Sequence, residues 1–198
     1  MAQPAEQPRY TYAEYLERER ETGIKHEFIN GQIYAMAGGT LAHARLIFRL
    51  GLMIGNRLPQ TCEAFSSDAK LRSLESDIAT YPDLAVVCGK VLTHPEDPNA
   101  FTNPKVLVEV LSPSTEAYDR GQKWAHYRRI PSLEAYVLVN QAPVSSDAPD
   151  SGTRLEVFER LPSGEWVHRV ANVGERLRIH ALDLEIDVDA LYAGAGAL

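Results

Sequence analysis

The sequence has few cysteines and lacks a long apolar run. Its two cysteines, Cys62 and Cys88, give no disulfide framework and no metal-ligand spacing, so a reducing compartment is the default. No apolar segment approaches the roughly 20 residues that a membrane-spanning helix needs. Residues 1–8 lack a basic region followed by an apolar one, so we expect no secretory signal. These absences predict a cytoplasmic protein with no membrane partner.

The chain also lacks an excess of positive charge. Its formal net charge is −7, which argues against a generic nucleic-acid coat, because such proteins bind mainly by neutralising phosphates. A nuclease with a local basic rim remains compatible with this total. Two segments could supply the rim, although either could equally be the solvated face of a helix. They are Arg45, Arg49 and Arg57, and then Arg120, Lys123, Arg128 and Arg129.

The 198 residues, 44% hydrophobic and 24% charged, have the composition of an ordinary globular protein. We expect a disordered tail over 1–9 and a single mixed α/β domain over 10–198. Helices are predicted over about 11–22, 43–58 and from 116 or 119 to 129. Strands are predicted over 24–29, 32–36, 62–66, 69–73, 80–88, 105–111, 133–139, 154–160, 165–171 and 177–179. Segments 89–104 and 141–152 are expected to be loops.

Two carboxylates interrupt strand-like apolar runs. Asp83 lies within 80–88 and Glu109 within 105–111, 26 residues later. Burying a carboxylate without a partner is costly, so its presence in a strand needs a reason. If the two strands are neighbours and both side chains point to one face, the carboxylates can converge on one Mg²⁺ or Mn²⁺ ion. The alternative is structural: Asp83 could bond the backbone, and Glu109 could pair with a basic residue.

A lysine follows the second of these strands. Lys123 lies on the predicted helix after Glu109, from where its ammonium could orient a water and stabilise charge on a phosphoryl group. Lys105 is a poorer choice. It lies four strand residues from Glu109, roughly 13 Å away at about 3.3 Å per residue.

Taken in order, these segments resemble the Uma2 family of the restriction-endonuclease-like, PD-(D/E)XK superfamily. The similarity spans about Tyr10 to Tyr192. It is carried by Thr11 to Leu16, by the hairpin His26 to Tyr34, by Tyr81 to Val87, by Leu107 to Thr115, and by Asp119 to Lys123 with Tyr127. The stretch from Leu107 to Thr115 is the most specific.

The resemblance implies a restriction-endonuclease-like core, with a mixed central sheet flanked by helices and extra β-hairpins. It also implies a divalent metal held by Asp83, Glu109 and the carbonyl of Val110. In the superfamily's commonest pattern the lysine follows the acid by two residues, where this chain has Leu111. The lysine role therefore moves to Lys123.

Other positions depart from the family pattern or are secondary candidates. The hairpin carries Asn30 and Gln32 where the family usually has acids, and Val139 is followed by Asn140-Gln141. Glu27 aligns with a recurrent hairpin glutamate and could bond Lys123 or a metal-bound water, or form a structural ion pair. His43 aligns at the start of its helix and faces inward, as core or capping histidines also do. Trp124 and Tyr127 are expected to pack in the core.

We therefore expect a Mg²⁺-dependent endonuclease in which Asp83, Glu109 and Lys123 act on DNA. A non-catalytic or regulatory interaction protein that keeps the fold is the main alternative, and a hydrolase of small phosphoesters is a third. Nucleases that cut both strands often use two sites, so a homodimer is a reasonable expectation.

Overall fold

The structure is a computed structural model that describes residues 8–36, 38–141 and 154–193. It has a mixed α/β fold built on two six-stranded sheets and a two-stranded one. Most of the predicted tail and of the predicted loop 141–152 lies outside the described residues. Within the described part of the chain, no helix is long and apolar enough to cross a membrane.

The larger core surrounds a mixed sheet with the strand order β12-β11-β10-β9-β6-β3. β9 runs parallel to β10 and antiparallel to β6. These strands are β3 (Cys62–Ser66), β6 (Leu84–Cys88), β9 (Val106–Leu111), β10 (Ala135–Asn140), β11 (Arg154–Arg160) and β12 (Trp166–Asn172). β6, β9 and β10 are buried almost throughout, which explains why their sequences are near-continuously apolar.

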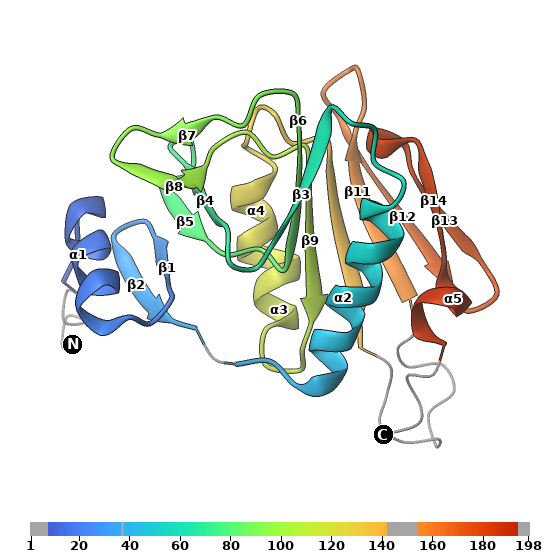
Figure 1. Cartoon of the computed structure of the whole chain (residues 1–198), viewed down its shortest axis with the longest axis horizontal. Coiled ribbons are helices and arrows are strands. Elements are labelled where there is room, and N and C mark those ends of the chain that lie inside the picture. The colour runs from blue at the N-terminus through green and yellow to red at the C-terminus, as the bar shows by residue number, and fades with distance from the viewer. Residues whose placement is uncertain (1–7, 37, 142–153, 194–198) are drawn as a thin grey trace, which may run out of the picture.

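Helices cover both faces of this sheet. On one face, Leu46, Leu50 and Ile54 of α2 (Leu41–Gly55) pack with α5 (Val188–Tyr192) and the hairpin of β13 (Arg176–Ile179) and β14 (Leu184–Asp187). On the other face lies one continuous helical segment made of α3 (Glu116–Tyr118), the π-helix η1 (Asp119–Lys123) and α4 (Trp124–Tyr127). Figure 1 shows α2 and the α3–α4 segment on opposite sides of β3 and β9. A 3₁₀ turn, η2 (His180–Leu182), joins β13 to β14.

The second six-stranded sheet has the order β2-β1-β5-β4-β8-β7. Its strands are β1 (His26–Ile29), β2 (Gln32–Ala35), β4 (Lys70–Ser73), β5 (Ile78–Thr80), β7 (Thr93–His94) and β8 (Asp97–Phe101). The predicted Asn30-Gly31 turn joins β1 to β2, with both residues at positive φ. Helix α1 (Tyr12–Thr22) begins at the predicted capping box of Thr11 and Glu14 and packs on β1 at one end of the molecule (Figure 1).

Four features differ from the sequence-based expectation. The strand predicted over 80–88 is divided, because β5 ends at Thr80 and β6 begins at Leu84. The predicted loop 89–104 contains β7 and β8. The predicted helix from 116 to 129 is interrupted by η1. Finally, Cys62 and Cys88, which are directly opposite each other on β3 and β6, form a disulfide, so the expectation that they give no disulfide framework is wrong.

Arg120 ties the helical segment to the sheet. Its guanidinium donates two hydrogen bonds to Glu156 on β11, of 2.7 and 2.9 Å, and others to Glu116 and Asn140. Burial of Glu156 opposes ionisation, but Arg120 outweighs it and holds the pKa of this carboxyl below its usual value. This anchor fixes η1 against the sheet.

We predict that Glu156→Gln lowers the free energy of unfolding by about 2 kcal/mol at neutral pH, because charge-assisted hydrogen bonds to a buried group are lost. A depressed carboxyl pKa contributes stability above the pKa of the unfolded chain and loses it as pH falls through the folded-state pKa. The difference from wild type should therefore shrink in acid. Urea denaturation measures it, with the exposed Glu165→Gln as control. A difference that persists undiminished in acid would contradict the assignment.

Candidate active site

Asp83 and Glu109 meet at the junction of β6 and β9. Leu84 of β6 pairs with Val108 of β9, so continuing this antiparallel register by one residue sets Asp83 opposite Glu109. Residues directly opposite in such a pair present their side chains to the same face. Asp83 Oδ2 also accepts a hydrogen bond of 2.7 Å from the amide of Val110. The two strands are thus neighbours, as the predicted convergence requires.

Lys123 extends from η1 into the same cluster. Its Nζ lies 2.9 Å from Glu109 Oε1, 3.2 Å from Glu27 Oε1 and 3.5 Å from Asp119 Oδ1. Only 7% of the lysine side chain and 5% of the Glu109 side chain are exposed, so these charges interact with little screening by water. The lysine predicted for the site therefore contacts the carboxylate predicted for it.

Two residues of the π-helix η1 enter the cluster, because residues four apart in sequence lie on one face of a helix. A π-helix closes i→i+5 hydrogen bonds and so has a wider turn than an α-helix, and such turns are frequent at functional sites. Asp119 and Lys123, at its two ends, are both buried and contact each other. Asp119 was not predicted as a site residue. The sequence offered one signal for it, its position in the segment Asp119 to Lys123 that carries the family resemblance.

Tyrosines complete the surroundings of the carboxylates. Tyr127, fully buried, donates a 3.0 Å hydrogen bond to Glu109 Oε1, and its hydroxyl also lies 2.9 Å from Thr80 Oγ1. Tyr118 donates a longer bond of 3.4 Å to Glu27. Tyr127 was expected only to pack in the core, because a tyrosine at helical spacing gives no sign of its hydroxyl's partner. Trp124 does pack there, stacked against Phe158.

The cluster holds more acidic groups than basic ones. Burial raises the pKa of Glu109 well above the ordinary carboxyl range; Lys123 opposes this, while the charges of Asp83 and Asp119 add to it. Burial also raises the pKa of Asp119. For Lys123 burial alone would lower the pKa, but the surrounding acids, Glu109 first, outweigh it and raise the pKa well above its usual value. The lysine is therefore charged, while burial and crowding disfavour the ionised forms of Glu109 and Asp119.

His43 contacts the Asp83 end of the cluster. Its Nε2 lies 3.2 Å from Asp83 Oδ2, and its ring also bonds the backbone of Val110. The hydrogen bond to Asp83 raises the pKa of His43, although burial opposes it. Gly39 packs so closely that a Cβ there would lie 2.8 Å from His43 Nδ1, so only glycine leaves room for the ring in this position.

The oxygen atoms of the cluster suit a hard divalent cation, but the side chains alone do not complete a coordination shell. Carboxylate and carbonyl oxygens are the ligands that Mg²⁺ and Mn²⁺ prefer. Glu27 Oε1 is buried and, despite its nearness to Lys123, has no hydrogen-bond partner. However, over residues 8–36, 38–141 and 154–193 no three His, Cys, Asp or Glu side chains gather as ligands of one ion. An ion here would need backbone and water ligands besides Asp83 and Glu109.

Two basic residues considered from the sequence, Lys105 and Arg120, have other partners in the structure. Lys105 pairs with Glu134, 3.0 Å away, away from the cluster as expected. Arg120 is engaged by Glu116 and Glu156, so it is part of the anchor of η1 and not an open basic rim.

Known proteins are similar to this chain in sequence or in fold. The chain is 35% identical over 191 residues to the Synechocystis sp. protein named "Uncharacterized protein slr1290", covering 94% of this chain and 93% of that protein. It is 41% identical over 161 residues to "Uncharacterized protein sll1609" of the same organism, covering 79% and 84%. A crystal structure from Anabaena variabilis, described as "a putative nuclease belonging to DUF820", superposes with a TM-score of 0.68 at 17% identity, covering 88% of this chain and 93% of that one.

A family model described as "Putative restriction endonuclease" also matches residues 12–189. This match covers both strands of the carboxylate cluster, η1 and the hairpin that carries Glu27. The fold of the solved neighbour agrees with the restriction-endonuclease-like architecture expected from the sequence. The chain belongs to the Uma2 family.

Proposed function

We propose that the protein is a divalent-metal-dependent endonuclease that hydrolyses phosphodiester bonds of DNA. One observation carries the proposal: a single lysine, Lys123, lies among the carboxylates of Glu27, Glu109 and Asp119, with Asp83 next to them. Four acids share one ammonium, so ionising all of them is unfavourable without further positive charge. A divalent cation would supply that charge, and the match to a family described as a putative restriction endonuclease supports the same proposal.

Asp83, Glu109 and the carbonyl of Val110 would hold Mg²⁺ or Mn²⁺, with waters and a substrate phosphate as further ligands. When bound, the ion would supply the positive charge that makes a water nucleophilic and stabilises a phosphoryl oxygen. Tyr127 and Lys123 already orient Glu109 through contacts of 3.0 and 2.9 Å. His43 and the Val110 amide likewise orient Asp83.

Lys123 would position the attacking water and add positive charge where negative charge develops on the phosphate. Such preorganised charge acts strongly in a site from which water is excluded. Glu27 and Asp119 also contact the ammonium, at 3.2 and 3.5 Å. Their contacts keep the lysine extended toward Glu109, which compensates for its departure from the superfamily's usual position two residues after the acid.

A second candidate function rests on the hydrogen bonds that Asp83 makes. His43 and the Val110 amide both bond Asp83 Oδ2, and Lys123 bonds Glu109, as in a purely structural polar cluster. On this reading the chain keeps the nuclease fold and acts as a non-catalytic interaction protein. It predicts no saturable binding of divalent ions.

Titration calorimetry with Mn²⁺ separates the two functions. We expect wild type to bind Mn²⁺ saturably. Asp83→Asn and Glu109→Gln should each abolish this binding, because each replaces one proposed carboxylate ligand by an amide of nearly the same size. Glu134→Gln, whose carboxylate pairs with Lys105 elsewhere, should bind as wild type does. Absence of Mn²⁺ binding to the folded wild type would favour the interaction protein.

Cleavage of plasmid or oligonucleotide DNA with Mg²⁺ tests the role of Lys123. We expect Lys123→Met to reduce the single-turnover rate by about 10²–10³-fold, the usual effect of losing one charge-stabilising donor, while Mn²⁺ binding persists. Lys105→Met, which removes a lysine outside the cluster, should cleave normally.

Equal cleavage by wild type and Lys123→Met would contradict the assigned role. DNA affinity that falls steeply with salt separates a DNA nuclease from a hydrolase of small phosphoesters. Sedimentation at the assay concentration tests the expected homodimer.

A further inference from the structure

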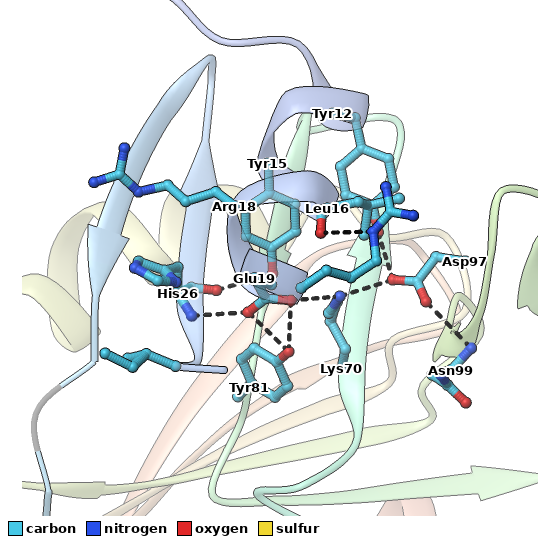
Figure 2. A network of polar contacts seen from close by, with 12 residues as sticks. Tyr12, Tyr15, Leu16, Arg18, Glu19, His26, Lys70, Tyr81, Asp97 and Asn99 are labelled. Atoms are coloured by element: carbon cyan, nitrogen blue, oxygen red, sulfur yellow. Dashed lines mark hydrogen bonds and ion pairs between the residues drawn. The ribbon is translucent and has the colours of Figure 1, made fainter. Parts of the chain in front are cut away.

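A second buried polar cluster lies outside the candidate active site, where α1 packs against β4 and β8. We call it the Glu19 cluster, made of Glu19, Lys70, Tyr81 and Asp97. Lys70 Nζ lies 2.7 Å from Glu19 Oε2 and 2.8 Å from Asp97 Oδ2. Figure 2 shows Glu19 between His26, Tyr81 and Lys70, with Asp97 beyond the lysine. These residues are among those that line a cleft of about 900 Å³, which the proposed reaction does not use.

Glu19 joins two segments that are far apart in the sequence. Its Oε1 accepts a 2.8 Å hydrogen bond from the backbone amide of His26, and both of its oxygens accept bonds of 3.0 Å from the hydroxyl of Tyr81. Each segment continues directly into the candidate active site. Glu27 follows His26, and Asp83 lies two residues after Tyr81.

The His26 segment depends on α1 because the sheet leaves it unpaired on one side. β5 pairs only with Phe28 and Ile29 of β1, so it does not reach His26. Instead Glu19 binds the amide of His26, and the hydroxyl of Tyr15 donates a 2.9 Å hydrogen bond to its carbonyl. Both backbone groups of the residue before Glu27 are thus held by α1.

The Tyr81 segment is short and stiff. It is the break between β5 and β6, so no strand pairing of the described residues holds it. Pro82 fixes its own φ and restricts the conformation of Tyr81. Fixing the position of the Tyr81 side chain therefore also restricts the position of Asp83, because the backbone between them has little conformational freedom.

Lys70 keeps Glu19 in place. It is itself buried and bonded on its other side to Asp97, which also accepts a 2.9 Å hydrogen bond from Tyr12 of α1. The ammonium also lies over the rings of Tyr15 and Tyr81, at 5.0 and 5.8 Å. The carboxylate of Glu19 consequently has a defined position from which it can hold the other two segments.

We propose that Glu19 is a positioning residue for the carboxylate site, holding Glu27 through the backbone of His26 and Asp83 through Tyr81. A role of Glu19 in catalysis rests on the proposed function. Its role in holding the two segments in position does not depend on a metal.

The test compares Glu19→Gln with Glu17→Gln, which changes an exposed acid on the same helix. In metal-free protein, we expect Glu19→Gln to speed amide hydrogen exchange at Glu27 and at Val110, whose amide donates to Asp83 Oδ2, and to leave Val157 of β11 unchanged. Its Mn²⁺ affinity should fall about 10-fold, the usual effect of losing a residue that orients a metal ligand. Glu17→Gln should match wild type in both measurements.

Tyr81→Phe is the second variant, because Glu19→Gln leaves Lys70 with one charged partner and could fail to fold. It keeps the ring and removes only the link to the Asp83 segment, so exchange should quicken at Val110 and not at Glu27. Unchanged exchange at Val110 in Tyr81→Phe overturns the inference, as does unchanged exchange at both positions in a folded Glu19→Gln. If wild type binds no Mn²⁺, the proposed function fails, while the exchange data still decide the positioning role.

Discussion

The burial of Lys123 among carboxylates is the interaction on which the rest of the structure depends. Removing charges from water is costly, so the cluster exists only because separate elements deliver its members together. β1 brings Glu27, the segment before β6 brings Asp83, β9 brings Glu109, and η1 brings Asp119 with Lys123. Arg120 and Glu156 hold η1 in place, and Tyr127, whose hydroxyl also contacts Thr80, donates a hydrogen bond to Glu109. The excess of acidic over basic groups in this cluster is the feature on which the proposed metal site rests.

Much of this arrangement could be predicted from the sequence, because its strongest signals are local. Buried strands appear as apolar runs, so β9 and β10 were predicted within about two residues of their ends. The capping box of Thr11 and the Asn30-Gly31 turn identified α1 and the β1–β2 hairpin. An acid within each of two apolar runs drew attention to Asp83 and Glu109, and their shared face followed from strand alternation once the strands proved to be neighbours.

The parts that could not be predicted depend on contacts between distant segments. The disulfide needed the pairing of β3 with β6, and two cysteines alone do not reveal this. β7 and β8 lie in a segment rich in proline and acids, which local propensity assigns to a loop. The π-helix differs from an α-helix by one residue per turn, too little for hydrophobic periodicity to register. Asp119 and Tyr127 were missed as partners of Lys123 and Glu109 because helical spacing shows the face on which a residue lies and not the partner of its polar group.

The disulfide has a consequence for the unfolded chain. It joins residues 26 apart in sequence, and the closed loop contains Lys70, Tyr81 and Asp83. Closing a loop of this length removes conformational freedom from the denatured ensemble, worth about 3 kcal/mol in the chain-entropy account. The segment that carries Asp83 is thereby covalently tethered at both ends to paired strands. When local hydrogen bonds open, the disulfide still limits the conformations that this segment can adopt. The segment therefore stays close to its native position and can return to it quickly.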